Sequence, residues 1–148
     1  MKAVLQRVLT SRVEVADEIV GEIKHGWLVL LGVGKGDTAE IAQYLADRCV
    51  KLRGFSDEQG KMNLSVQDVG GSILIVSQFT LVADCIRGRR PSFDAAAPPV
   101  LANELYETFC ECIRATGVPV ATGVFQADMK VTLTNDGPVT FIIEKNAC

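Results

Sequence analysis

Seven consecutive residues without a polar side chain, Trp27 to Val33 (WLVLLGV), constrain the fold more than any other segment. A run without a polar face predicts a strand that is buried on both sides of a sheet. The run is far shorter than the roughly 20 residues that a membrane-spanning helix needs, so we expect no association with a membrane.

The chain has 148 residues, of which 48% are apolar and 22% are charged. This length favours one domain over residues 1–148, and the apolar content excludes a disordered chain. Charged residues from Arg7 onward interrupt the N-terminal segment, so it does not resemble a signal peptide. The five cysteines are scattered, and Cys110 and Cys112 do not face each other on a predicted helix, so neither a disulfide framework nor a zinc site is favoured. Free thiols fit the cytoplasm, where we expect the protein to reside.

Several further segments have the patterns of helices and strands. Asp37 followed by Glu40 resembles a capping box and begins a predicted helix that ends near Gly54. Pro99 begins a second helix, because proline suits the first helical turn. Strands are predicted at residues 3–9, 12–16, 18–23, 27–33, 72–76, 129–134 and 139–144. The expected fold is α+β, with a mixed, curved, barrel-like β-sheet and two main helices in a single domain.

The single histidine and a group of three glycines are weak evidence for a catalytic triad and for a nucleotide site, respectively. His25 is the only histidine and lies in a predicted turn, so a hydrolytic triad would have to use it, and an exposed turn histidine is the commoner case. Gly32, Gly34 and Gly36 follow the apolar strand, but their spacing matches neither the dinucleotide fingerprint nor the phosphate loop. We interpret these glycines as a turn between a strand and a helix.

The segment Ser77 to Thr80 ends a predicted core strand with hydroxyl, amide and aromatic side chains. Ligands often bind at such strand ends, and backbone N–H groups released from the sheet there can bind an oxyanion. Alternatively, the serine and threonine only satisfy local backbone groups.

Two other segments allow a functional and a purely structural interpretation. Gly137-Pro138 lies between two predicted strands and, by composition alone, forms a hairpin turn. The net charge of −3 argues against a protein that coats nucleic acid, yet Arg87, Arg89 and Arg90 form a local basic cluster. Guanidinium groups bind phosphates well, but surface arginine clusters in solvated loops are also common.

Taken together, the sequence resembles the D-aminoacyl-tRNA deacylase family over essentially its whole length. The resemblance begins at Met1–Val8 and continues through the apolar strand. Its most specific parts are Ser77-Gln78-Phe79-Thr80 and Asn135-Asp136-Gly137-Pro138-Val139-Thr140, in this order and at this spacing. Further matching segments are Arg89–Phe93 and Ala127-Asp128-Met129.

The resemblance implies a homodimer that binds tRNA and hydrolyses the ester between a D-amino acid and the terminal adenosine. It also implies mischarged glycyl-tRNA as a further substrate. It implies a cis Gly137-Pro138 pair that enters the active site of the partner subunit. There, backbone carbonyls would hold the substrate amino group and exclude an L side chain. The ribose 2′-hydroxyl would assist the attacking water, and the resemblance implies neither a metal nor another cofactor.

The resemblance also assigns roles to individual residues. The backbone N–H groups of Phe79 and Thr80 would stabilise the oxyanion, whereas a nucleophilic Thr80 side chain is doubtful because no base accompanies it. The expected substrate-binding residues are Ser77, Gln78, Phe79, Met129, Gly137 and Pro138. Phe79 and Met129 would form walls for the adenosine, and Arg7 would brace the incoming Gly-Pro segment. Arg87, Arg89 and Arg90 would contact tRNA phosphates.

One position departs from the family pattern, because Gln126 follows Phe125 where a glycine is usual. This glutamine can reshape the adenosine pocket. Two other functions remain open on the sequence: a hydrolase that uses the Thr80 or Ser77 side chain, and a dimeric RNA-binding module that uses the three arginines without catalysis.

Overall fold

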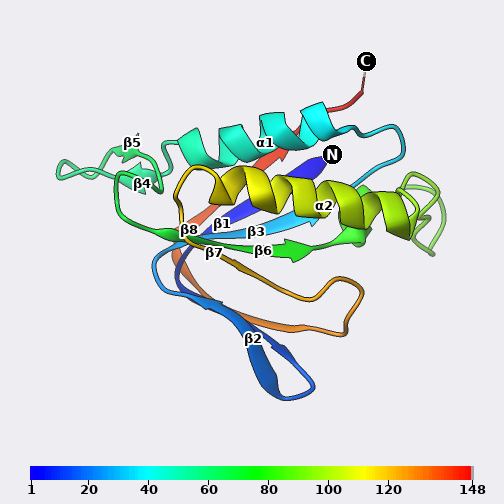
Figure 1. The fold of residues 1–148 in the computed structure, drawn as a ribbon, viewed down its shortest axis with the longest axis horizontal. Helices are drawn as coiled ribbons and strands as arrows, with labels where there is room; N and C mark the ends of the chain where they lie inside the picture. Colours follow the sequence, from blue (N-terminus) through cyan, green and yellow to red (C-terminus); the bar gives the residue numbers. More distant parts are fainter. Residues whose placement is uncertain (148) are drawn as a thin grey trace.

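Two helices cover one face of a strongly curved sheet in the computed structural model, which describes residues 1–147 (Figure 1). The strands are β1 (Lys2–Val15), β2 (Glu18–Ile23), β3 (Gly26–Gly32), β4 (Phe55–Ser56), β5 (Met62–Leu64), β6 (Ser72–Ser77), β7 (Val120–Thr122) and β8 (Lys130–Glu144). The helices are α1 (Ala39–Lys51), α2 (Pro99–Arg114) and the short 3-10 helix η1 (Phe79–Val82). Within residues 1–147, no helix is long and apolar enough to cross a membrane.

The main sheet mixes parallel and antiparallel pairs and nearly closes on itself. Its order is β2-β1-β3-β6-β7, with β8 also paired to β1. The pairs β3–β6 and β6–β7 are parallel, whereas β1 pairs antiparallel with β2, β3 and β8. The first and last strands of this order, β2 and β7, lie close together. A Cβ atom added to Gly21 in β2 would lie only 2.4 Å from the Thr122 carbonyl oxygen in β7. The prediction of a mixed, barrel-like sheet is therefore confirmed.

The apolar run from Trp27 to Val33 forms a central strand buried on both faces, as predicted. Trp27, Val29 and Leu31 point into the large core under the two helices. Leu28 points the other way and packs with Leu74 and Val76 in a smaller core inside the curved sheet. The alternation of side chains along a strand explains why every position in the run has to be apolar.

The two longest strands differ from the prediction. The segments predicted at residues 3–9 and 12–16 merge into one strand, β1, which ends at Val15, and the two segments predicted around Asn135–Pro138 merge into one strand, β8, which begins at Lys130. The predicted hairpin turn is therefore wrong: both halves of β8 pair with β1. Between the pairs Gln6–Thr140 and Val8–Asn135, β1 has one residue and β8 has residues 136–139, so β8 bulges there. The Gly137-Pro138 peptide bond in this bulge is cis, as the resemblance implies.

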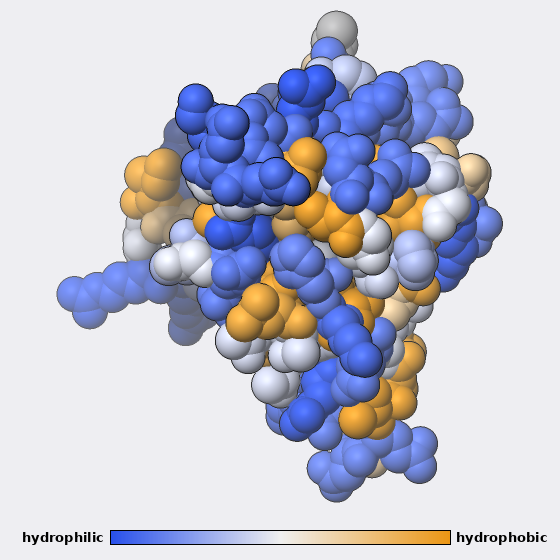
Figure 2. All heavy atoms as spheres, turned by 90° about the vertical axis from the view of Figure 1, so that its left-hand side faces the viewer, coloured by the Kyte–Doolittle hydropathy of each residue, from blue (hydrophilic) through white to orange (hydrophobic). Residues whose placement is uncertain are grey.

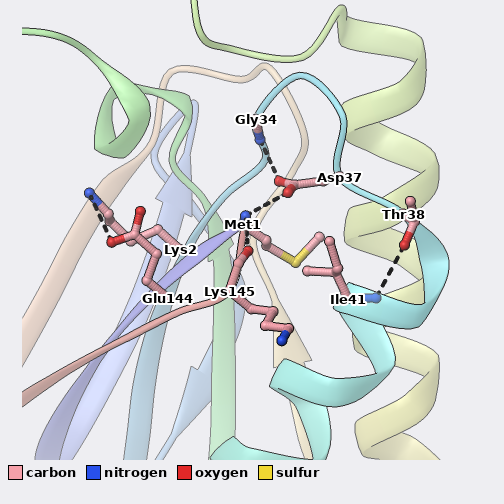
Figure 3. Close-up of polar contacts among 8 residues, drawn as sticks. All are labelled: Met1, Lys2, Gly34, Asp37, Thr38, Ile41, Glu144 and Lys145. Atoms are coloured by element: carbon pink, nitrogen blue, oxygen red, sulfur yellow. Dashed lines mark hydrogen bonds and ion pairs between the residues drawn. The ribbon is translucent and has the colours of Figure 1, made fainter. Parts of the chain in front are cut away.

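A buried ion pair fixes the start of β1 to the segment before α1 (Figure 3). The Met1 ammonium group donates to Asp37 Oδ1 at 2.6 Å and to the Lys145 carbonyl at 2.8 Å, while the Gly34 N–H donates to Asp37 Oδ2 at 2.7 Å. The prediction that Asp37 caps α1 is therefore wrong. The cap is Thr38, whose hydroxyl accepts from the Ile41 N–H.

Other differences from the prediction lie in short elements. Strand β7 and the small β4–β5 pair are too short to show a clear period in the sequence. Gly54 does not adopt the left-handed conformation of a helix-ending glycine; instead, an added Cβ atom would lie 2.4 Å from the Trp27 ring. This glycine lets the chain after α1 pass against the buried tryptophan.

Candidate active site

The strand β6 ends at Ser77, and the chain then turns sharply into η1. The Gln78 N–H donates to the Leu31 carbonyl at 2.8 Å, which ties the turn to the end of β3. Gly32 allows the close approach, because an added Cβ atom would lie 2.9 Å from Leu81 Cβ and 3.1 Å from the Gln78 carbonyl oxygen. Gly32, the last residue of β3, thus positions η1, a role that the spacing of the glycines could not reveal.

A pocket of about 200 Å³ lies beside η1, at the carboxyl ends of the parallel strands β3 and β6. Its polar lining residues are Ser77 and Gln126, and its apolar lining residues are Val33, Phe79, Ala96, Ala97, Pro99, Ala102 and Phe125. The N-terminal end of α2 forms part of the wall (Figure 1). An apolar pocket with a few polar groups at this place in a sheet is typical of a ligand site.

Two backbone N–H groups at this site are free to bind a ligand. Within the described residues, neither the Phe79 nor the Thr80 N–H has a hydrogen-bond acceptor, whereas the Leu81 and Ala83 N–H groups donate to the carbonyls of Gln78 and Thr80. Neighbouring free N–H groups can stabilise the negative charge of a tetrahedral oxyanion. The Phe79 side chain is 55% exposed, and its ring lies 5.1 Å from the Phe93 ring.

The hydroxyl groups at the site have no candidate base within residues 1–147. The Thr80 hydroxyl accepts a hydrogen bond from the Gln78 amide. His25 lies at the opposite end of β6, beside Ser72, and its Nε2 is 3.8 Å from Asp136 Oδ2. Ser72 and Ser77 lie five positions apart on the strand, which is roughly 17 Å. Across the described residues, no group of three or more His, Cys, Asp or Glu side chains could hold a metal ion.

Tyr106 in α2 packs beside the pocket, and nothing in the sequence indicated this role. Its hydroxyl donates to the Ile75 carbonyl at 2.9 Å, two residues before Ser77, and its ring lies 6.2 Å from the Phe125 ring. Burial raises the pKa of Tyr106. Burial also raises the pKa of Cys49 and of Cys110 to about 12, so neither thiol is a nucleophile near neutral pH.

The structure does not bring every expected binding residue to the pocket. Met129 does not line it; this side chain packs against the smaller core, where a Cβ atom added to Gly123 would lie 2.6 Å from its sulfur. Phe125, four residues earlier, does line the pocket. Gln78 does not line the pocket either, because its amide turns toward Thr80.

Arg7, Asp136 and the Gly137-Pro138 segment form a second group at the opposite end of the sheet. The buried Arg7 side chain donates from Nε to the Asp136 carbonyl at 3.0 Å and from Nη1 to the Gly54 carbonyl at 2.9 Å. Arg7 Nε also lies 3.3 Å from Asp136 Oδ2. The arginine was expected to brace a partner's Gly-Pro segment; in the structure it holds the segment of its own chain.

This second group lies far from the pocket of the same chain. Arg7 pairs with Trp27, four residues from Leu31, which is roughly 13 Å along the strands. Three strand spacings, roughly 14 Å, separate β8 from β6 across the sheet. The Gly137-Pro138 segment therefore does not contribute to the pocket of its own chain.

The three arginines lie together on an exposed loop. Asp84 and Ser92 exchange two backbone hydrogen bonds, of 2.8 and 2.9 Å, and close the loop that carries Arg87, Arg89 and Arg90. All three side chains are exposed, and none forms an ion pair with another described residue. The loop follows η1 and lies at the N-terminal end of α2 (Figure 1). Because Pro99 and Ala102 in this part of α2 line the pocket, the loop presents positive charge beside it.

Comparison with known proteins identifies the family. A family model described as D-Tyr-tRNA(Tyr) deacylase matches residues 4–144. The chain is 62% identical over 144 residues to a D-aminoacyl-tRNA deacylase of Geobacter sulfurreducens, covering 97% of this chain and 95% of that protein. It is 59% identical over 145 residues to a D-aminoacyl-tRNA deacylase of Pelobacter propionicus, covering 98% of this chain and 100% of that protein.

Two solved structures share the fold of this chain. A structure described as the c-Myc DNA Unwinding Element Binding Protein has a TM-score of 0.93 and 40% identity, with 99% of this chain and 100% of that chain covered. A probable eukaryotic D-amino acid tRNA deacylase shares the fold, with a TM-score of 0.82 and 17% identity, over 96% of this chain and 97% of that chain. From its family match and its close relatives, the chain belongs to the D-aminoacyl-tRNA deacylase family.

Proposed function

We propose that the protein hydrolyses the ester between a D-amino acid and the 3′-terminal adenosine of tRNA, and that it also accepts glycyl-tRNA. One observation carries this proposal for a chain of this family: among the described residues, the backbone N–H groups of Phe79, which lines the apolar pocket, and of the adjacent Thr80 have no hydrogen-bond acceptor. The reaction takes place in the cytoplasm, which the free thiols fit.

The proposed chemistry uses the backbone and the substrate rather than a protein side chain. Water attacks the ester carbonyl carbon, and the Phe79 and Thr80 N–H groups donate to the resulting oxyanion. One such donor is typically worth about 3–4 kcal/mol in the transition state. The ribose 2′-hydroxyl assists proton transfer from the water, and the bond to the 3′-oxygen then breaks. The absence of a base beside the Thr80 hydroxyl within residues 1–147 supports this assignment over a side-chain nucleophile.

The handedness of the substrate is proposed to be selected by the partner subunit's Gly137-Pro138 segment. Its carbonyl groups would hold the substrate amino group and leave no room for an L side chain. The distance between this segment and the pocket of its own chain supports insertion into a second copy. The Arg7 hydrogen bond to the Asp136 carbonyl keeps the segment in one conformation, which a steric filter requires.

The surface supports the proposed homodimer. Among the described residues, strand β8 is paired only with β1, so its other edge is free along residues 130–144. Ile142 in this strand is 68% exposed, and Leu9 in β1 is 51% exposed. Figure 2 shows apolar groups interrupting the hydrophilic surface at the end of the molecule that carries β4 and β5. A free edge with exposed apolar side chains favours association with another chain.

The loop with Arg87, Arg89 and Arg90 is proposed to bind phosphates of the tRNA acceptor stem. Its charge is unpaired within the described residues, and it stands next to the pocket where the 3′ end would bind. Replacing one phosphate-binding arginine with alanine should flatten the dependence of log K on log salt by about 0.9, by analogy with duplex DNA.

The test is a side-by-side hydrolysis assay with D-, L- and glycyl-tRNA under the same conditions. We expect turnover of the D- and glycyl esters and none of the L ester. Salt-dependent binding without turnover would instead favour an RNA-binding module, and equal turnover of both enantiomers would contradict the filter. The Gly137→Ala variant should lose D-aminoacyl turnover, because the added methyl group would lie 3.2 Å from Arg7 Nη2 and 2.9 Å from Val139 Cγ2.

Mixed dimers test whether the site is shared between subunits. Gly137→Ala keeps the pocket and alters the filter. Phe79→Ala keeps the filter and the N–H group but removes the aromatic ring that lines the pocket, so it should lose activity through weaker substrate binding. If the filter enters the partner's pocket, mixing the two inactive variants produces one intact site in each mixed dimer and restores part of the activity. If both parts act within one chain, the mixture stays as inactive as either variant alone.

A further inference from the structure

Gln126 has a backbone conformation that is unfavourable for its residue type. It is the third residue of a turn closed by a 3.2 Å hydrogen bond from the Ala127 N–H to the Val124 carbonyl, and its φ angle is 63°. This left-handed region favours glycine and, after it, asparagine and aspartate. Because the turn is closed by backbone atoms alone, it would form more readily with glycine at this position. Side chains kept in such conformations are found preferentially at ligand sites.

Gln126 is an exposed residue, and it is also one of the residues that line the pocket. Gln126 and Ser77 are the two polar residues in a lining that is otherwise apolar. Within residues 1–147, neither the Gln126 carboxamide nor the Ser77 hydroxyl forms a hydrogen bond. A carboxamide has donors and an acceptor, so this residue can offer both to a bound molecule.

We propose that Gln126 determines the specificity of the pocket for adenine at the 3′ end of the tRNA, by hydrogen-bonding the polar edge of the base with its carboxamide. This inference rests on the proposed function. The aromatic side chains Phe79 and Phe125 suit the apolar faces of a purine. The 6-amino group of adenine donates and its neighbouring ring nitrogen accepts, which matches the acceptor and donors of one glutamine amide. A base with an oxygen at position 6 places an acceptor where adenine has a donor, and the match is lost.

The experiment compares the full chain and its Gln126→Gly variant on D-aminoacyl-tRNA ending in adenosine or in inosine. We expect the unaltered protein to prefer adenosine by about 10- to 100-fold in kcat/KM, the range for a paired amide–adenine contact. The variant should lose this preference, mainly through a higher KM for the adenosine substrate with little change in kcat. Gln43→Ala, on the exposed face of α1, is the matched control and should keep the preference.

Thermal unfolding separates this role from a structural one. Gln126→Gly should raise the melting temperature, because glycine adopts the left-handed conformation without a steric penalty. A purely structural role predicts a change in melting temperature with the adenosine preference intact. If Gln126→Gly still prefers adenosine as strongly as the unaltered protein, the inference is overturned while the deacylase function stands.

A binding measurement keeps the two proposals distinguishable. The affinities of the protein and of Gln126→Gly for CCA and CCI trinucleotides are measured by titration. If the unaltered protein hydrolyses no D-aminoacyl-tRNA, the proposed function fails, and the trinucleotides then test Gln126 separately. A preference for CCA that disappears in the variant supports the adenine contact, and equal affinities of the unaltered protein for CCA and CCI contradict it.

Discussion

The two ends of the central sheet each contain a charged pair, and the two pairs differ in how far they are buried. At the pocket end, the Met1 ammonium group and Asp37 are both buried and lie 2.6 Å apart. At the opposite end, Arg7 is buried, but Asp136 is 36% exposed and lies beside the Gly137-Pro138 bulge. The first pair fixes the framework of the fold, whereas the second fixes a backbone segment that faces outward.

The ends also differ in which backbone groups are left free. Beside the pocket, the N–H groups of Phe79 and Thr80 have no partner within residues 1–147. At the opposite end, Arg7 binds the carbonyls of Asp136 and Gly54, so the backbone there is held in place. One end is thus suited to bind a ligand, and the other to present a rigid surface. Four measurements, in order of decreasing effect, test this difference.

The largest effect is expected from the substrate at the pocket end. Replacing the terminal 2′-hydroxyl with hydrogen should lower the hydrolysis rate by about 10²- to 10⁴-fold, the usual range for loss of an acid–base group. Thr80→Ala should keep most of the activity, because the Thr80 contribution is its N–H. Single-turnover rates of both are compared, with Ser77→Ala as a second side-chain variant. The reverse result, an inactive Thr80→Ala with an active 2′-deoxy substrate, would favour a side-chain nucleophile.

Asp37→Asn should lower the free energy of unfolding by about 3–5 kcal/mol, because the buried ammonium group of Met1 would lose its counter-charge. Denaturant unfolding measures the change. Asp47→Asn is the matched control, since Asp47 pairs with Lys51 on the exposed surface of α1 and should cost no more than about 0.5 kcal/mol. Equal changes in the two variants would show that the Met1–Asp37 pair contributes little.

Arg7→Ala should lower the free energy of unfolding by about 1–3 kcal/mol, because the buried Gly54 carbonyl would lose its hydrogen-bond donor. The D-aminoacyl hydrolysis rate should fall by more than this decrease in stability explains, since the Gly137-Pro138 segment would no longer be fixed. Arg12→Ala, at a 44% exposed position on the same strand, is the control. A stable Arg7→Ala protein with normal enantioselectivity would contradict the bracing role.

The smallest effect concerns the β4–β5 hairpin beside the second pair. Hydrogen bonds from the Asn63 side chain and from the Lys61 and Gln59 N–H groups lower the pKa of Asp57. A lowered folded pKa stabilises the folded state above the unfolded pKa, and this contribution is lost as the pH falls through the folded pKa. Asp57→Asn should therefore lower the melting temperature slightly at pH 7. Under strongly acidic conditions the variant and the unaltered protein should have the same melting temperature, because Asp57 is then protonated in both states. A pH-independent difference between variant and unaltered protein would contradict this account.

The local sequence determined the features that depend on side-chain pattern. Trp27–Val33 alternates between two cores, so its continuous apolar character alone predicted a strand buried on both faces. Pro99 began α2 where its missing N–H costs nothing. The segment Ser77–Thr80 left the sheet at a strand end, as its change from apolar to polar residues indicated.

Only the tertiary structure decided how distant segments meet, because strand pairing and close approach depend on partners that the local pattern does not contain. Asn135–Pro138 has the composition of a turn, but β1 is long enough to pair with both flanking halves, so one strand formed instead of a hairpin. Asp37 has the spacing of a helix cap, but a buried ammonium group is a stronger partner than a backbone N–H. Phe125, rather than Met129, reached the pocket, because the turn at Gln126 directs the two residues into different layers of the fold.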